Sequence, residues 1–287
     1  MKAAPAFGPD PRQQANWDWR AAGNFMCGGA GAGLIVFAVL SGIGGARFVA
    51  TLAAGLALVG AGLFFVWLEI GRPWRALHVY FNPRQSWMTR EAMVAAMLFP
   101  IGLAAMAVPS LRGLALLLAL GFVYCQARML QAAKGIPAWR EPMLVPLVVV
   151  TGLAEGGGLF LLAQPRHAAA DGALLVLFGA LVLARLAVGI AYRRRLRRVA
   201  ARGALAALDR TGRVLLHAGT VPALAAVLLV LTGALGGWVA WTLLAATGAL
   251  AAAAGAHFKH TLVTRAGFNQ GFALAHLPVR GVHRREA

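Results

Sequence analysis

The sequence predicts an all-α membrane protein, a bundle of about eight transmembrane helices with the N and C termini in the cytoplasm. Apolar runs of about twenty residues, the length that a helix needs to cross a hydrocarbon core, recur along the whole 287-residue chain. Almost all of the 27 Lys and Arg residues fall in alternate gaps between these runs. Helices are favoured over strands because the runs are continuous rather than alternating in polarity.

The apolar runs define the predicted elements in chain order. They leave a cytoplasmic N-terminal tail at 1–20, an eight-helix membrane domain at 21–257 and a cytoplasmic C-terminal tail at 258–287. The polar stretches outside the membrane domain are too short to build a soluble core. The predicted spans are 23–45, 48–69, 91–109, 111–127, 142–164, 172–192, 214–235 and 237–257.

Positive charge orients the predicted bundle. Only Arg47, Arg112 and Arg166 lie on the side opposite the termini, and Arg185 lies inside a span. Because cytoplasmic loops of membrane proteins carry the excess of Lys and Arg, the tails and the even-numbered connections are predicted to be cytoplasmic. The preference for Arg over Lys, with abundant Ala and Gly, is typical of a GC-rich bacterial genome. We therefore expect a multi-pass protein of the bacterial inner (cytoplasmic) membrane.

The net charge of +18 does not require a nucleic-acid partner. A nucleic-acid footprint is a basic face on a soluble fold, whereas these basic residues border apolar spans and suit contact with membrane lipid.

No metal or haem is expected in this chain. Cys27 and Cys125 both fall within apolar spans, where a small buried hydrophobe is the usual role of cysteine. A membrane haem needs two axial imidazoles that face each other inside the bundle, and only His217 and His257 lie near span ends.

The first span is rich in glycine around Asn24. Glycines at this spacing let helix backbones approach closely in a membrane. The alternative is that the missing side chains leave room for a flat ligand, with Asn24 as a hydrogen-bond donor. The glycines are Gly23, Gly28, Gly29, Gly31 and Gly33.

The connection after the second span is polar, basic and aromatic. Glu69 and Glu91 lie where helices leave and re-enter the membrane, and a carboxylate there is costly unless it is paired or hydrated. One interpretation is a structural network of ion pairs. The other is a site that holds the polar head of a lipid-soluble cofactor and exchanges protons with it. Candidate partners are Arg72, Arg75, Arg84 and Arg90, flanked by Trp67, Trp74 and Trp87.

Two further charges lie inside predicted spans. Glu155 precedes the glycine run Gly156–Gly158, and Arg185 lies in the next span, so a pair between the two charges is one interpretation. A secondary transporter is the alternative of another functional class, with the glycine run as a helix break. That alternative leaves the motifs between the second and third spans unexplained.

Those motifs resemble a known family. The runs Leu68–Pro73 (LEIGRP), Asn82–Arg84 (NPR) and Ser86–Glu91 (SWMTRE) resemble the signature of the NrfD-like membrane anchors of polysulfide reductase and DMSO reductase. The later run Gly135–Trp139 (GIPAW) is similar to another family motif, and the eight-span layout resembles the DMSO reductase anchor.

The resemblance implies a quinone-binding anchor subunit of a molybdopterin and iron-sulfur oxidoreductase, without haem. It implies a ferredoxin-like four-cluster Fe-S subunit and a molybdopterin catalytic subunit as partners, and ubiquinone or menaquinone as cofactor. Such a chain is non-catalytic for the substrate half-reaction but belongs to a quinone-linked oxidoreductase.

Site residues follow from the matched positions. Glu69 stands where the family has histidine, and a carboxylate can relay a proton but is a poorer donor to a quinone carbonyl when ionised. Glu91 matches the family's glutamate, and Asn24 matches an asparagine of the polysulfide reductase anchor. Glu69 and Glu91 are therefore predicted to exchange protons as the catalytic pair. The predicted cofactor-binding residues are Asn24, Arg72, Trp74, Arg75 and Arg90.

The charge bias and the resemblance together predict partners on the cytoplasmic side, and electron flow towards quinone. Anchors with cytoplasmic partners include those of sulfite dehydrogenase and phenylacetyl-CoA acceptor oxidoreductase. The runs Asp18–Asn24, Trp67–Trp74 and Thr264–Phe272 resemble the phenylacetyl-CoA type more than the sulfite type. The alternatives are a sulfite dehydrogenase anchor, a DMSO or polysulfide reductase-like anchor, and a purely structural anchor with quinone bound elsewhere.

Overall fold

The structure is a computed structural model that describes residues 10–70, 73–164 and 171–271, and the side chains of 73–75 are not described. Within these ranges the chain forms helices, and eight helical segments are long and apolar enough to cross a membrane. The predicted fold class, an all-α membrane bundle, is confirmed.

The first span is composite: α1 (Trp19–Gly23), the π-helical segment η1 (Asn24–Gly28) and α2 (Gly29–Leu40) follow one another without a break. The seventh span joins α9 (Arg202–His217) to α10 (Val221–Leu231). The other spans are α3 (Gly45–Glu69), α4 (Trp87–Ala107), η3 (Pro109–Leu111) with α5 (Arg112–Gln131), α7 (Leu144–Ala163), α8 (Gly172–Leu196) and α11 (Gly237–Thr264). Two short helices, η2 (Pro73–Phe81) and α6 (Pro137–Arg140), lie in connections.

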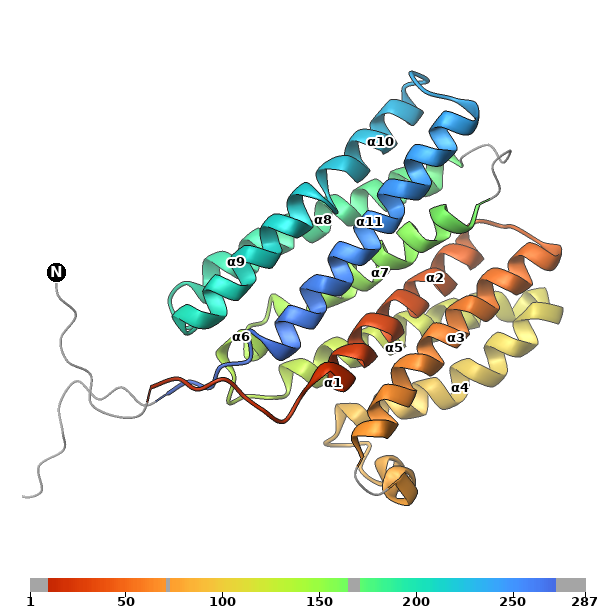
Figure 1. The fold of residues 1–287 in the computed structure, drawn as a ribbon. Coiled ribbons are helices and arrows are strands. Elements are labelled where there is room, and N and C mark those ends of the chain that lie inside the picture. The colour runs from red at the N-terminus through yellow and green to blue at the C-terminus, as the bar shows by residue number, and fades with distance from the viewer. Residues whose placement is uncertain (1–9, 71–72, 165–170, 272–287) are drawn as a thin grey trace, which may run out of the picture.

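Helix α7 lies between α2 and α11 and joins two groups of helices, as Figure 1 shows. On one side α3 and α5 pack against α2, and α4 packs against both of them. On the other side α9 and α10 pack against α11, and α8 packs against α7 and α10. The π-helical segment of the first span faces both groups, because α3, α5 and α11 all contact it. Polar side chains from both groups can therefore meet at the first span.

Glycines bring the central helices together. A Cβ atom added at Gly156 would overlap the backbone of Gly33 on α2, and one added at Gly158 would overlap the carbonyl of Gly248 on α11. The packing interpretation of the glycine-rich first span is therefore correct. Helix α7 runs unbroken through Gly156–Gly158, so the helix break proposed there for a transporter is wrong.

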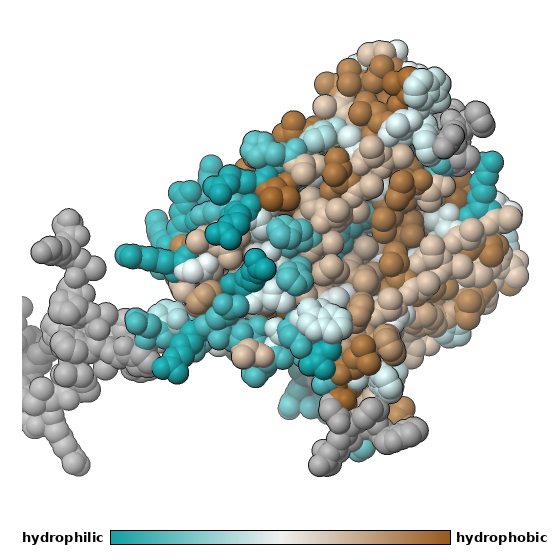
Figure 2. Space-filling model, in the orientation of Figure 1, coloured by the Kyte–Doolittle hydropathy of each residue, from teal (hydrophilic) through white to brown (hydrophobic). Residues whose placement is uncertain are grey.

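The described terminal segments meet at one end of the bundle. Gln13 forms an isolated antiparallel bridge with Phe268, and the Gln14 amide donates to the Gly267 carbonyl over 2.7 Å. On the face shown in Figure 2, hydrophilic residues gather at this end, whereas the body of the bundle is largely apolar. The described terminal segments therefore lie at one end of the bundle, which is consistent with tails on one side of the membrane. Which side that is remains a prediction from charge.

A motif near this end has a structural role. Trp139, the last residue of GIPAW, is buried and donates from Nε1 to the Leu262 carbonyl over 2.9 Å. Its ring stacks on Trp17 with a centroid distance of 5.0 Å. Asp18 then caps α1, accepting from the Arg20 amide over 2.7 Å, and the side-chain hydrogen bond from Arg20 lowers the Asp18 pKa.

Two spans extend beyond their predicted limits. Helix α11 continues to Thr264 instead of ending at 257, so Lys259 lies inside the bundle rather than in the C-terminal tail. Helix α9 begins at Arg202, within the stretch predicted as a polar loop at 193–213. Its arginines lie on an exposed face, while Ala204, Leu208 and Leu215 are buried on the opposite one. Because polar and apolar residues alternate along such an amphipathic helix, it contains no continuous apolar run that would predict it.

Candidate functional site

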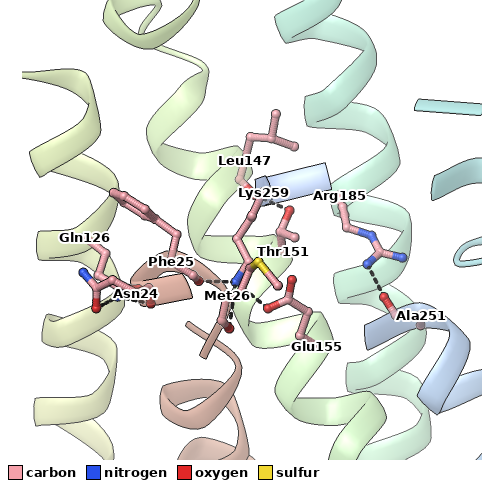
Figure 3. Close-up of polar contacts among 10 residues, drawn as sticks. All are labelled: Asn24, Phe25, Met26, Gln126, Leu147, Thr151, Glu155, Arg185, Ala251 and Lys259. Carbon is pink, nitrogen blue, oxygen red and sulfur yellow. Dashed lines mark hydrogen bonds and ion pairs between the residues drawn. The ribbon is translucent and has the colours of Figure 1, made fainter. Parts of the chain in front are cut away.

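The π-helical segment of the first span provides backbone acceptors for side chains of neighbouring helices. The Asn24 carbonyl accepts from Gln126 Nε2 of α5 over 2.9 Å. The carbonyls of Phe25 and Met26 accept from Lys259 Nζ of α11 at 2.5 and 3.4 Å. A π-helical turn departs from the regular α-helical hydrogen-bond pattern and is often found at functional sites. Figure 3 shows the two sets of contacts on opposite sides of this segment.

The first set is a buried cluster of Asn24, Glu91 and Gln126. Asn24 Nδ2 donates to Glu91 Oε1 over 3.2 Å, and Gln126 Nε2 also donates to Asn24 Oδ1 over 3.2 Å. All three side chains are buried. The structure thus brings together two residues predicted for the site, 67 positions apart in the sequence, and adds a third that sequence reasoning missed.

The start of α4 positions Glu91. Ser86 caps the helix by accepting from the Thr89 amide over 3.2 Å, which fixes the first turn. Glu91 follows on the buried face of α4, where it meets Asn24. Gly62 lets α3 pack closely against the first span beside Asn24, because a Cβ atom there would lie 2.9 Å from Gly28 N and 3.0 Å from Asn24 Oδ1.

A crevice of 890 Å³ lies between α3, α4 and η2, and Glu91 forms part of its wall. Most of the wall is apolar or aromatic, and the rings of Phe64 and Trp67 stack with a centroid distance of 5.8 Å. Such a wall with a few polar groups is typical of sites for flat, mostly apolar ligands. The wall also carries the polar groups of His78, Tyr80, Asn82, Ser86, Thr89 and Glu91.

A smaller cavity of 140 Å³ adjoins this crevice. Asn24 and Glu69 both line it, and it shares Val66, Ile70 and Met88 with the crevice wall. Glu69 is half-buried at the last turn of α3. The two predicted proton-exchanging carboxylates therefore line two cavities that share three apolar side chains.

Arg90 is the predicted cofactor-binding basic residue whose side chain the structure describes, and it does not line the crevice. Arg90 donates from Nε to the Pro83 carbonyl and from Nη2 to the Arg84 carbonyl, both over 2.8 Å. Its guanidinium also lies 4.2 Å from the centre of the Trp87 ring. Arg90 thus holds the loop before α4 in place. Arg72 lies outside the described residues, as do the side chains of Trp74 and Arg75.

The second set of contacts is an ion pair inside the bundle. Lys259 Nζ lies 2.5 Å from Glu155 Oε2, and both side chains are buried. The interpretation in which Glu155 pairs with Arg185 is therefore wrong. Arg185 instead donates to the carbonyls of Ala251 and Gly219 over 3.0 and 2.9 Å, where it supports the junction between α9 and α10.

Sequence reasoning missed Gln126, Lys259 and His78. The signal for the first two was helical spacing: Gln126 continues the buried series Ala115, Ala119 and Phe122, and Lys259 continues Gly248, Ala251 and Gly255. His78 lies on η2 between apolar residues, and only the fold of this connection brings it to the crevice.

Comparison with known proteins agrees with the motifs. Residues 9–109 match the family model described as polysulphide reductase, NrfD. This part of the chain includes the first three spans, Asn24, Glu69, Glu91 and the walls of the crevice. A search of curated proteins gave no match. The resemblance predicted from the motifs is thus confirmed for this part of the chain, at the level of the family.

Proposed function

We propose that this chain is the quinone-binding membrane anchor of a multi-subunit oxidoreductase. In this proposal it passes electrons between an iron-sulfur subunit and the quinone pool. The observation that carries the proposal is the position of Glu91, which is hydrogen-bonded to Asn24 on one side and lines the 890 Å³ crevice on the other. A quinone, when bound, supplies the two-electron and two-proton chemistry, while the protein supplies binding and proton exchange.

The crevice suits the head group of a quinone. The stacked rings of Phe64 and Trp67 offer a flat apolar surface, and the His78 imidazole and the Glu91 carboxyl offer groups that donate or accept protons. Glu69 stands where the family has histidine, so an imidazole at the crevice has to come from another residue, and His78 lines the crevice. We infer that His78 provides the imidazole donor from η2.

Glu91 is placed to hold and transfer a proton. Its Oε1 accepts from Asn24, and Gln126 in turn donates to the Asn24 side chain, so the amides fix the carboxyl where it borders the crevice. A carboxyl group held by a hydrogen-bond donor on one side and facing a ligand space on the other is suited to general acid–base chemistry. Glu69, at the adjoining cavity, is the proposed second group on the proton route.

The partners proposed from the resemblance are a ferredoxin-like Fe-S subunit and a molybdopterin subunit, docked at the end of the bundle where the termini meet. The excess of Arg and Lys at that end supports a cytoplasmic location. The choice of phenylacetyl-CoA as the substrate of the catalytic subunit rests on the sequence resemblance alone.

Filling the crevice tests the proposal. Ala96 is exposed and lines the crevice, so Ala96→Trp should fill the space without strain in the core. The test is binding of water-soluble ubiquinone and menaquinone analogues to the purified full-length chain in detergent. We expect Ala96→Trp to weaken binding of one or both quinone analogues by at least about tenfold, because the indole would occupy the space of the quinone ring.

The neighbouring residue provides a matched control. Met97 is exposed on the same helix but does not line the crevice, so Met97→Trp should leave binding unchanged. Equal affinity in the wild type and Ala96→Trp would exclude this crevice as the quinone site. A purely structural anchor would bind neither analogue.

A further inference from the structure

A second cavity lies in the other half of the bundle, away from the proposed quinone site. It has a volume of 420 Å³ and opens between α8 and α9, with α7 and α11 behind them. The side chains that line it on α8 recur at helical spacing, from Leu186 through Gly189 and Ile190 to Arg193, Arg194 and Arg197. One wall is thus basic at the charged edge of the bundle and mostly apolar further in. There the buried Arg185 also borders the cavity, its guanidinium hydrogen-bonded to the carbonyls of Ala251 and Gly219.

Helix α9 supplies a second wall with the same polarity. Its lining residues run from Asp209 through Gly212 and Arg213 to Leu215 and Leu216. Arg194 and Leu186 are eight residues apart, which corresponds to about 12 Å along a helix axis. The groove therefore extends from the charged edge of the bundle about 12 Å towards the apolar middle. This polarity matches an amphiphile with its head at the membrane surface.

The charge at the mouth of the groove is strongly positive. Arg193 is paired with Asp209 through two hydrogen bonds of 2.5 and 2.6 Å, which ties α8 to α9 and uses the carboxylate. Arg194, Arg197 and Arg213 are exposed beside this pair. In addition, Arg193 Nη1 is buried and has no hydrogen-bond partner among the described residues. The mouth therefore offers guanidinium donors suited to a phosphate group.

We propose that this groove binds one anionic phospholipid, with its phosphate against Arg194, Arg197 and Arg213 and an acyl chain along Leu186, Ile190 and Leu216. A free phosphate would use only the mouth and leave the apolar length of the groove unfilled. A basic recess at the edge of a transmembrane bundle is a recognised way to select anionic lipid. The proposal does not depend on quinone binding, because the crevice lies between α3 and α4.

Lipid binding to the purified full-length chain tests the proposal. The probes are phosphatidylglycerol and phosphatidylcholine in detergent, with binding measured by native mass spectrometry. The triple variant Arg194→Gln, Arg197→Gln and Arg213→Gln should lose affinity for phosphatidylglycerol by about tenfold or more, because each basic residue near the head group contributes to binding. The control triple variant Arg198→Gln, Arg202→Gln and Arg210→Gln changes exposed arginines that do not line the groove, and should keep the affinity.

A second variant fills the apolar part of the groove and keeps every charge. Gly189 lies between Leu186 and Ile190 on α8, and a Cβ atom there would lie 3.8 Å from Leu147 Cδ1, an ordinary contact. Gly189→Leu should therefore be accommodated on α8 and occupy the groove. We expect it to weaken phosphatidylglycerol binding as well. Unchanged binding in this variant would overturn the proposal, since the arginines would then act without the groove.

Two more results would contradict the lipid assignment. Equal binding of phosphatidylcholine would remove the requirement for an anionic head group. Complete competition by millimolar inorganic phosphate would identify a free-anion site instead. If the arginine variant kept its lipid affinity but lost assembly with its partner subunits, the arginines would be a protein-docking surface and the proposal would also fail.

Discussion

Lys259 Nζ on α11 lies 2.5 Å from Glu155 Oε2 on α7, and neither side chain is accessible from outside the bundle. The same ammonium group donates to the Phe25 carbonyl of the first span. Buried charges are tolerated when they are paired. This pair therefore ties together the three helical segments at the centre of the fold.

Removing Lys259 should destabilise the bundle. Lys259→Met leaves Glu155 as a buried carboxylate without its partner, which typically costs about 3 to 5 kcal/mol. We expect a clearly lower midpoint of thermal unfolding for the purified chain in detergent. Lys134→Met, at an exposed position in a connection, should leave the midpoint unchanged.

The double variant Lys259→Met with Glu155→Leu separates charge from packing. It removes both charges and should recover much of the stability, since replacement of a buried pair by apolar residues is often nearly neutral. A double variant less stable than Lys259→Met would show that side-chain shape, rather than the unpaired charge, dominates at this site.

Glu91→Gln should impair quinone turnover in the assembled complex. The amide keeps the size of the side chain but cannot release a proton, and positioned acid–base groups typically contribute about 10² to 10⁴ in rate. We expect a lower kcat with quinone and a flatter dependence of kcat on pH. Quinone-analogue affinity should change much less than kcat.

Glu141 provides the control for that experiment. It is a carboxylate at the end of the bundle where the termini meet, paired with Arg195 at 3.5 Å, and it does not line the crevice. Glu141→Gln should keep both the turnover and the pH profile. Full turnover and an unaltered profile in Glu91→Gln would refute the proposed role of Glu91 in proton exchange.

Gly156→Ala should disrupt packing between α7 and the first span. The new methyl group would overlap the backbone of Gly33 and Leu34, so the helices would have to separate. At Gly121 of α5 an added Cβ atom would lie 3.7 Å from Val94, an ordinary contact. We therefore expect a lower unfolding midpoint for Gly156→Ala but not for Gly121→Ala.

Cysteine labelling in intact cells tests the predicted orientation. In a background with Cys27 and Cys125 replaced by alanine, Gln85→Cys and Ser110→Cys place exposed thiols at opposite ends of the bundle. An impermeant maleimide added outside should label position 110 and not position 85. The reverse pattern would place the crevice and the partner subunits on the outer side.

The spans were predictable because the thickness of the hydrocarbon core sets the number of apolar residues that a spanning helix needs. The resemblance placed Asn24 and Glu91 at one site, but it did not predict the hydrogen bond between them. The partner of Glu155 was not predictable in the same way. Lys259 follows His257 near the end of an apolar run, and such a lysine normally marks the exit of a helix from the membrane.

What local sequence could not reveal depends on contacts between distant segments. Lys259 is stabilised inside the bundle by a carboxylate 104 residues away and by backbone carbonyls of the first span. His78 is brought to the crevice by the path of η2 beneath α3 and α4. Neither arrangement leaves a mark in hydropathy or in charge bias alone.

Both polar clusters of the first span use residues of the π-helical turn at Asn24–Gly28, so both depend on how the helix is rotated about its axis there. Each residue of an α-helix advances the chain by about 100° around the axis. Deletion of one residue from this turn would thus swing one half of the span against the other by roughly that angle. Asn24 and the Phe25 carbonyl could not then keep their present partners while Gly33 of α2 keeps its close contact with α7. The length of this five-residue stretch therefore couples both polar clusters to the packing of the central helices.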